Sequence, residues 1–118
     1  YNTWPLMGNS YFPDDNEFVN LFKLSAFSDP SLVQYLHRNL AYLIFIIYIV
    51  ILYITYRNKI FNLFKPVIIL GLIILLQIVL GILTVLSGAS ILTASLHQFS
   101  SILLITSSLY FLYKNNFN

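Results

Sequence analysis

Cysteine is absent from the sequence, and charged residues make up only 8% of its 118 residues. The missing thiols exclude disulfides, thiolate metal sites and cysteine nucleophiles. A soluble domain normally carries about a quarter charged residues, so this chain cannot cover its surface with polar groups. Hydrophobic residues reach 58%, and the mean hydropathy is +0.80. The composition therefore predicts a protein whose solvent is lipid.

Carboxylates are scarce as well, and none follows residue 29. A nucleophilic triad would need an acid near a histidine, and neither histidine has one nearby in the sequence. No glycine-rich phosphate-binding motif occurs, and the formal net charge of +2 is too small to indicate nucleic acid. The four acids are Asp14, Asp15, Glu17 and Asp29.

The first 29 residues form a polar and aromatic stretch with turn signals at Pro5, Gly8 and Pro13. We expect an extramembrane loop over 1–29. Apolar positions within 17–27 fit a short amphipathic helix at the membrane interface, and an ordinary loop fits the same residues. The first residue is not Met, so we expect the chain to be a fragment or a processed piece of a longer protein.

Three apolar segments follow, each long enough for the roughly 20 residues that cross a bilayer. The first runs from Pro30 to about residue 56, with Asp29 as its cap and Pro30 at the first helical position. Pro66 is expected to open the second, over 67–86, and the third covers 91–113. The fold class predicted for 30–118 is all-α and integral to the membrane, with three transmembrane helices.

Basic residues set the expected orientation. Three of the six cations, Arg57, Lys59 and Lys65, share the connection 57–65, which contains no acid. By the positive-inside rule this connection is cytoplasmic, or on the matrix side in a mitochondrion. The C-terminus then lies on the same side, and the loop 1–29 and the turn 87–90 lie outside.

The only two histidines open the first and the last apolar segment. His37 lies about 10 Å along its helix from Pro30, and His97 about 8 Å into the third span, at 1.5 Å per residue. Both helices begin on the same side, so the two imidazoles are expected at one depth. An unpaired imidazole in lipid is costly. A haem iron with two axial imidazoles, held between facing helices, accounts for both.

Other polar residues near the histidines are candidates for supporting roles. Arg38 could pair with a haem propionate or extend to lipid headgroups. Gln34 and Gln98 are candidates for hydrogen bonds that orient an imidazole or join two helices. Zinc or copper would want a third or fourth ligand, and the only methionine, Met7, lies in the loop. Small residues beside the histidines let helices, or a flat ring, approach closely.

Four motifs are spaced along residues 1–98: YNTWPLM at 1–7, Asp29-Pro30 followed by VQYLHR at 33–38, QIVLGILT at 77–84, and ASLHQ at 94–98. Together they resemble the C-terminal half of the haem A synthase family, and the resemblance covers the whole chain. Without a loop cysteine pair, the sequence is most similar to the cysteine-free class of mitochondria and related bacteria.

The resemblance implies an eight-helix protein made of two four-helix bundles, of which this chain holds helices six to eight. His37 and His97 would be the axial ligands of a haem b that transfers electrons. In the family, a glutamate three residues before the first histidine marks the half that binds haem O. Gln34 stands at that position here, so no catalytic residue is expected in this chain.

The family's reaction is oxidation of the C8 methyl of haem O to the formyl group of haem A. The implied partners are haem O as substrate, membrane lipid, haem O synthase, an electron donor and further copies of the chain. The implied location is a bacterial cytoplasmic membrane or the mitochondrial inner membrane. Two alternatives stay open: another bis-histidine membrane cytochrome b, and a non-haem transporter or assembly subunit with histidines as proton relays.

Overall fold

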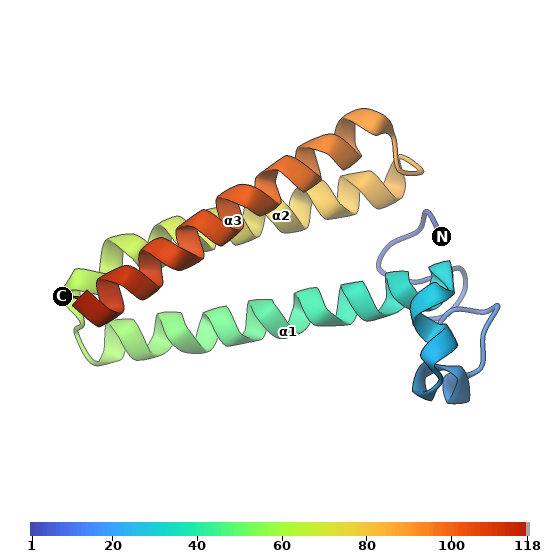
Figure 1. Cartoon of the computed structure of the whole chain (residues 1–118), viewed down its shortest axis with the longest axis horizontal. Helices are drawn as coiled ribbons and strands as arrows, with labels where there is room; N and C mark the ends of the chain where they lie inside the picture. Colours follow the sequence, from blue (N-terminus) through green and yellow to red (C-terminus); the bar gives the residue numbers. More distant parts are fainter. Residues whose placement is uncertain (118) are drawn as a thin grey trace.

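The computed structural model describes residues 1–117, and these residues form helices and loops without a sheet. Figure 1 shows three long helices running back and forth beside a compact N-terminal segment. The described part of the chain measures 49 × 32 × 24 Å. Its elements are the 3₁₀ helices η1 (Phe18–Phe22) and η2 (Leu24–Ser28) and the α-helices α1 (Pro30–Arg57), α2 (Phe61–Leu86) and α3 (Ile91–Phe117).

The start of α1 is the predicted one. The Asp29 carboxylate accepts hydrogen bonds from the backbone N–H groups of Ser31 and Leu32, both at 3.0 Å. Pro30 occupies the first turn, where its missing N–H leaves no partner unsatisfied. This cap fixes the helical register and hence the position of every residue in the first turns of α1.

The start of α2 differs from the prediction, because the helix begins at Phe61 and encloses Pro66. Aromatic packing explains the earlier start: the ring of Phe64 stacks on that of Tyr56 at 4.4 Å and contacts that of Phe61 at 5.3 Å. These contacts fix the first turn of α2 against the end of α1. A proline this close to the helix start removes only one backbone hydrogen bond. The expectation that Pro66 opens the helix was therefore wrong.

The stretch 17–27 does not form a single amphipathic helix. Its two 3₁₀ helices are separated at Lys23, whose backbone is extended with φ −96° and ψ 146°. Ala26 is the only buried residue of the two turns, while Phe18 and Phe22 are exposed. The third long helix also differs from its expected end, since α3 continues past residue 113 to Phe117.

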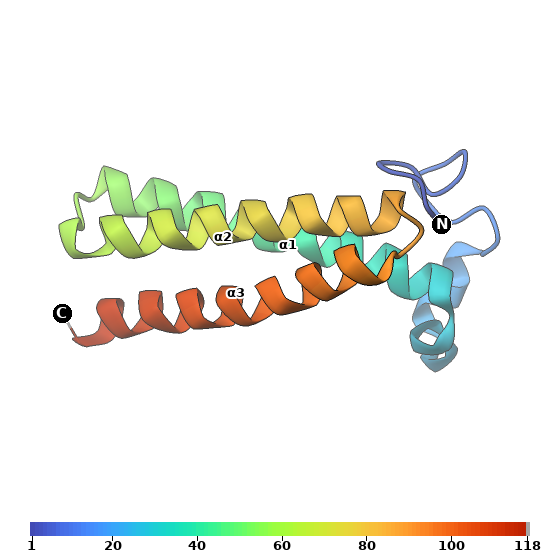
Figure 2. The same ribbon diagram turned by 90° about the horizontal axis from the view of Figure 1, so that it is seen from above.

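The helices pack as a close pair with a third helix splayed from it. Figure 2 shows α3 running beside α2, and Figure 1 shows α1 diverging from both toward the N-terminal segment. A small core of Tyr48, Val67, Leu70 and Ile74 joins α1 to α2. We call the part that contains 1–45 and 75–97 the histidine end, and the part that contains 46–74 and 98–117 the basic end.

Two of the three long helices, α1 and α2, are long and apolar enough to cross a membrane. Within these helices most large apolar side chains are exposed, as expected where lipid is the neighbour. In contrast, α3 carries a histidine, a glutamine and several serines and is not among the candidate spans in the described residues. The structure thus supports a helical membrane protein with two spans, and a third span over α3 stays a prediction.

Candidate functional site

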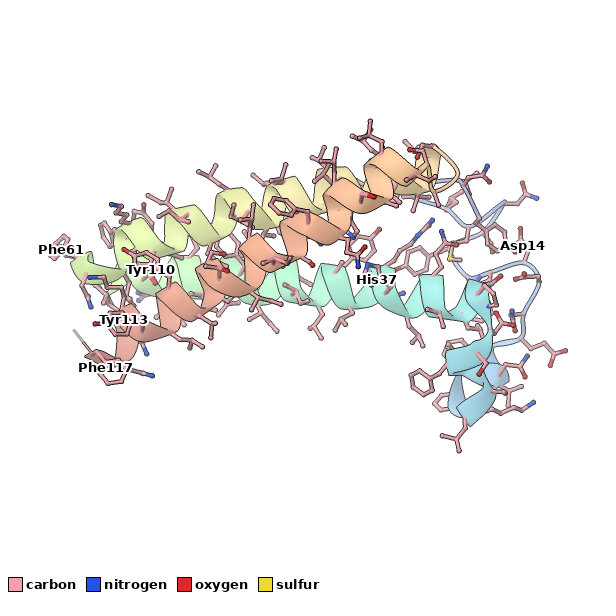
Figure 3. The ribbon with its side chains drawn as sticks, turned by 45° about the horizontal axis from the view of Figure 1, so that its top comes forward. Asp14, His37, Phe61, Tyr110, Tyr113 and Phe117 are labelled. Atoms are coloured by element: carbon pink, nitrogen blue, oxygen red, sulfur yellow. The ribbon has the colours of Figure 1, made fainter. Side chains whose placement is uncertain are left out.

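The two histidines meet at the histidine end, although sixty positions separate them. His37 projects from α1 and His97 from α3, and their ring centroids lie 6.3 Å apart with the planes at 82°. Figure 3 labels His37 in the half of α1 nearer the N-terminal segment. The caps that start the two helices place these residues: Asp29 for α1, and Ser90, whose backbone oxygen accepts from Ala94 at 2.9 Å, for α3.

A glycine on α2 provides the space for His97. A Cβ atom added at Gly81 would lie 3.1 Å from Cε1 of His97 and 3.6 Å from its Nδ1, so the imidazole edge rests on bare backbone. The Nδ1 atom is fully buried and has no hydrogen-bond partner within residues 1–117.

A cavity of about 520 Å³ lies beside both imidazoles. Residues of α1, α2, α3 and the N-terminal segment all contribute to its wall, so it forms only when the tertiary structure is complete. Most of the wall is apolar, with a few polar groups, as in typical cofactor sites. Its polar or aromatic members are Trp4, His37, Arg38, Tyr42, Phe45, Gln77, Thr84 and His97.

The donor set at this cavity fits a haem better than a bare metal ion. Among residues 1–117 no three His, Cys, Asp or Glu side chains come together. A structural zinc site requires four protein ligands. Haem iron requires only two axial ligands from the protein, because the ring nitrogens supply the other four. Two imidazoles from separate helices, one with a buried unpaired nitrogen, satisfy that requirement.

Arg38 lies in the cavity wall, and its guanidinium is bound to the main chain of the N-terminal segment. Nη2 donates to the carbonyl oxygen of Thr3 at 2.7 Å, and Nη1 donates to those of Leu6 and Pro5 at 3.2 and 3.3 Å. Arg38 is 8% exposed, and its Nε atom is buried without a partner in the described chain. The sequence did not indicate these three hydrogen bonds.

The two glutamines singled out beside the histidines lie in different surroundings. Gln34 Nε2 donates to the carbonyl oxygen of Tyr1 at 2.7 Å, which ties it to the N-terminal segment. Gln98 is exposed on α3, and its backbone carbonyl oxygen accepts from the Ser101 hydroxyl at 2.6 Å. The structure shows no hydrogen bond from either side chain to an imidazole in residues 1–117, and a role for these glutamines in orienting the imidazoles stays a prediction.

Gln77 has a clearer place at the site. Its Oε1 accepts a hydrogen bond from the hydroxyl of Ser100, which is 2% exposed and lies one turn after His97. Gln77 also lines the cavity. The sequence does contain a signal for it: Gln77 is the only polar side chain between Pro66 and Thr84, and a lone amide in an apolar helix needs a partner.

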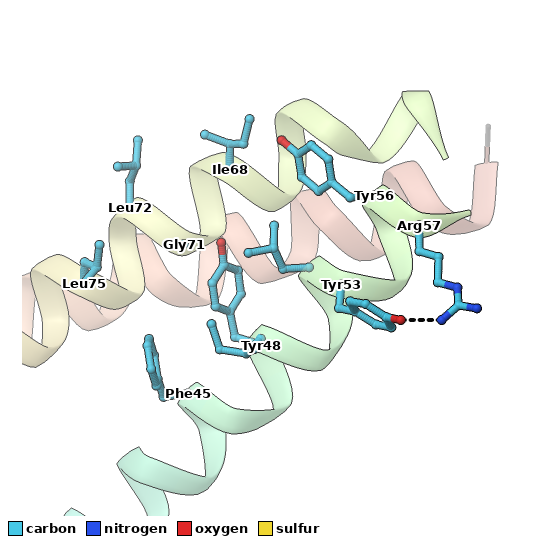
Figure 4. A pocket seen from close by; sticks show the side chains of 11 residues that line it. Phe45, Tyr48, Tyr53, Tyr56, Arg57, Ile68, Gly71, Leu72 and Leu75 are labelled. Carbon is cyan, nitrogen blue, oxygen red and sulfur yellow. Dashed lines mark hydrogen bonds between the residues drawn. The ribbon is translucent and has the colours of Figure 1, made fainter. Parts of the chain in front are cut away.

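A second cavity of about 980 Å³ opens at the basic end between α1 and α2. Figure 4 shows Tyr48 pointing at Gly71 and the hydrogen bond between Arg57 and Tyr53 at its rim. The Tyr48 hydroxyl donates to the carbonyl oxygen of Val67 at 3.2 Å. This cavity has no histidine, and aromatic and aliphatic side chains line it with Arg57.

Comparison with known proteins gives one family. The model of a family described as "Cytochrome oxidase assembly protein" matches residues 1–109. Among curated relatives, "Heme A synthase" of Pelagibacter ubique (strain HTCC1062) is 45% identical over 116 residues, covering 98% of this chain and 34% of the relative. "Heme A synthase" of Rickettsia prowazekii (strain Madrid E) is 34% identical, covering 98% and 35%, and that of Wolbachia pipientis wMel is 39% identical, covering 95% and 30%.

The chain thus spans about a third of the length of the curated relatives that it matches. No solved structure matches it significantly. The family model's match over residues 1–109 covers both histidines, the cavity wall and the N-terminal segment.

Proposed function

Because the chain belongs to the cytochrome oxidase assembly protein family, we propose that it is the part of a haem A synthase that binds haem b. In this proposal His37 and His97 are the axial ligands of the haem iron, and the cavity between α1, α2 and α3 holds the ring. The family match favours this function over a different bis-histidine cytochrome and over a transporter with proton-relay histidines.

One observation carries the proposal: the only two imidazoles of the chain approach to 6.3 Å from separate helices at one cavity. A haem held by two imidazoles supplies one-electron redox chemistry when it is bound. The chain's own residues would orient the two ring nitrogens and keep water from the iron. Gly81 supports this role, because the missing side chain leaves room for the His97 imidazole at the cavity wall that both residues line.

The oxidation of haem O to haem A is proposed for the whole enzyme, about three times the length of this chain. No catalytic residue is assigned here, because Gln34 stands where the family has a glutamate in the half that binds haem O. Haem O, haem O synthase, an electron donor and a second copy of the enzyme are the proposed partners. Electron transfer through haem b would be this part's contribution to the reaction.

The proposed location is a bacterial cytoplasmic or mitochondrial inner membrane. All three long helices would span it. The third, α3, would contribute His97 to the haem cavity. It would complete the bundle together with a helix from the rest of the enzyme. Arg57, Lys59 and Lys65 would mark the cytoplasmic or matrix side, and the histidine end would lie outside. A topology reporter fused at Lys59 should read cytoplasmic, and a reporter active only outside would overturn this orientation.

The haem-ligand role is tested in the full-length enzyme by replacing each histidine. His37→Ala and His97→Ala should each lose the low-spin six-coordinate absorbance spectrum of haem b. Thr106→Ala, an exposed change on α3, is the matched control and should keep it. His97→Gly with added imidazole should recover the spectrum, because free imidazole can replace the missing ligand in a cavity that remains folded.

Unchanged haem content and spectrum in both alanine variants would contradict the assignment. Haem A analysis in cells that carry the full-length gene then separates the first alternative from the proposal, since another cytochrome b would bind haem without producing haem A. A wild-type protein that binds no haem at all would favour the transporter.

A further inference from the structure

The N-terminal segment is fixed on the first turns of α1 by contacts far apart in sequence. The Tyr11 hydroxyl donates to Oδ1 of Asn39 at 2.8 Å. The rings of Tyr11 and Phe12 pack edge-on against that of Tyr35, with centroids 5.7 and 5.1 Å apart. Met7 is fully buried. This segment is therefore a defined part of the histidine end.

Residues 3–8 are braced from within as well. The Thr3 hydroxyl donates to the carbonyl oxygen of Leu6 at 2.9 Å, and the Gly8 N–H donates to Oγ1 of Thr3 at 3.0 Å. Gly8 has φ +80°, a conformation that glycine adopts without strain. The three carbonyl groups that point at Arg38 thus belong to a rigid turn, and holding that turn fixes the residues within it.

Trp4 is the residue of this turn that reaches the histidine cavity. Its side chain is part of the same wall as His37 and His97, while its neighbours Thr3 and Pro5 present their carbonyl groups to Arg38. Trp4 is 43% exposed, so its indole lies between the cavity and the outer surface on the side of the N-terminal segment. Its position depends on the guanidinium that binds the residues on either side of it.

We propose that residues 3–8 form a cap that shields the haem cavity from water, and that Arg38 is the positioning residue that holds the cap closed with Trp4 over the cavity. This inference rests on the proposed function for the identity of the ligand. The existence of the cap is inferred only from the hydrogen bonds of Arg38 and from the burial of Arg38 and Met7. Neither propionate pairing nor contact with lipid headgroups explains three hydrogen bonds to the carbonyl groups of one turn.

The geometry requires arginine rather than any cation. A guanidinium presents several N–H donors in a planar fork, whereas an ammonium is a compact point charge. Lysine at position 38 would keep the charge but could not donate to the carbonyl oxygens of Thr3, Pro5 and Leu6 with the same geometry. A role that needs only charge therefore tolerates Arg38→Lys, and the cap does not.

The closing experiment uses the full-length enzyme with a single introduced cysteine, Met7→Cys, any native cysteine elsewhere having been replaced. Met7 is 0% exposed, so a water-soluble maleimide should react slowly at position 7 while the cap is closed. Arg38→Lys should raise the labelling rate about tenfold or more, because hydrogen bonds from a charged donor are lost. Arg57→Lys, the same change at the far end of α1, is the matched control and should leave the rate unchanged.

The second measurement is the midpoint potential of the bound haem. Admitting water to the cavity stabilises the ferric form and should lower the potential, both in Arg38→Lys, which keeps the charge, and in Trp4→Ala, which keeps the hydrogen bonds. Faster labelling without a change in potential would mean that the segment does not cover the haem. Unchanged labelling in Arg38→Lys would remove Arg38 as the positioning residue. If the wild-type enzyme binds no haem, the proposed function fails, and the labelling result still decides whether the cap exists.

Discussion

The histidine end and the basic end are built from the same helices but in different ways. At the basic end, the contacts join helix to helix: Phe64 stacks on Tyr56 across the short turn between α1 and α2, and the Asn62 side chain donates to the backbone carbonyl oxygen of Lys114 on α3 at 3.3 Å. At the histidine end, Arg38 reaches back to Thr3. The basic end is therefore closed by packing between the helices, and the histidine end by a non-helical segment that folds back onto α1.

The two cavities reflect this difference. The cavity at the basic end is the larger, and its wall comes from α1 and α2 alone. The cavity at the histidine end draws on three helices and the N-terminal segment, and its wall includes both histidines, Arg38 and Gln77. Polar groups in a lipid-facing protein are costly unless they have a partner or a function. We therefore propose ligand chemistry for the histidine end and packing for the basic end.

The strongest way to break the basic end is Gly71→Ala. A Cβ atom at Gly71 would lie 2.5 Å from Cζ of Tyr48 and closer still to its hydroxyl, so the core of α1 and α2 must open. We expect the free energy of unfolding of the full-length enzyme in detergent to fall by about 2 kcal/mol, as for overpacked cores. Combining it with Tyr48→Ala should cost less than the sum of the two. Additive costs would mean that the clash between the new Cβ atom and the Tyr48 side chain does not cause the loss of stability.

The helix cap at Asp29 starts α1 at the histidine end, and Asp29→Ala tests it. The carboxylate accepts from the N–H groups of Ser31 and Leu32 and from Nδ2 of Asn16. Its loss should reduce the free energy of unfolding by about 1 kcal/mol and loosen the N-terminal segment, with hydrogen exchange rising first in residues 16–34. Asn caps helices nearly as well as Asp, so Asp29→Asn should behave almost like the wild type. Equal losses of stability in both variants would argue against the role of Asp29 as the helix cap of α1.

The counterpart of Gly71 at the histidine end is Gly81. Here an added Cβ atom would lie 3.1 Å from Cε1 of His97, so a shift of a few tenths of an ångström accommodates it. Gly81→Ala should therefore cost well below the roughly 1–3 kcal/mol of an overpacked core. It should nevertheless change the haem spectrum or its electron paramagnetic resonance signal, because the imidazole must tilt. If Gly81→Ala destabilised the enzyme as much as Gly71→Ala without a spectral change, the ends would not differ as described.

The smallest effect concerns pH at the outer surface of the N-terminal segment. The Asn9 N–H and the Ser10 hydroxyl hold the pKa of Asp14 below its ordinary 3.8, so this carboxylate supports the segment above that pH. The support is lost as the pH falls through the lowered pKa. Hydrogen exchange in residues 7–15 should rise below about pH 4, the ordinary range of an Asp. In Asp14→Asn that rise should be smaller, and the remainder should belong to Asp15, because the Ser31 hydroxyl lowers the pKa of that carboxyl as well. An undiminished rise in Asp14→Asn would contradict the role of Asp14.

Much of this molecule can be read from the sequence alone. Its scarce charge predicted a membrane protein, Asp29 and Pro30 predicted the start of α1, and four motifs predicted the family that the comparison then found. Similar distances of the two histidines from their helix starts also predicted that the two side chains lie near each other, and their ring centroids are 6.3 Å apart. Such features are local or periodic, so they can be read along the chain.

Tertiary contacts settled two features that the residue pattern along the chain does not reveal: where α2 begins and which groups Arg38 binds. The helix α2 begins at Phe61 because aromatic rings pack against α1, and Arg38 points toward the carbonyl groups of residues 3–6. A carbonyl group has no signature in a sequence, since every residue carries one. Which backbone oxygens a buried arginine meets is therefore settled only when segments more than thirty residues apart come into contact.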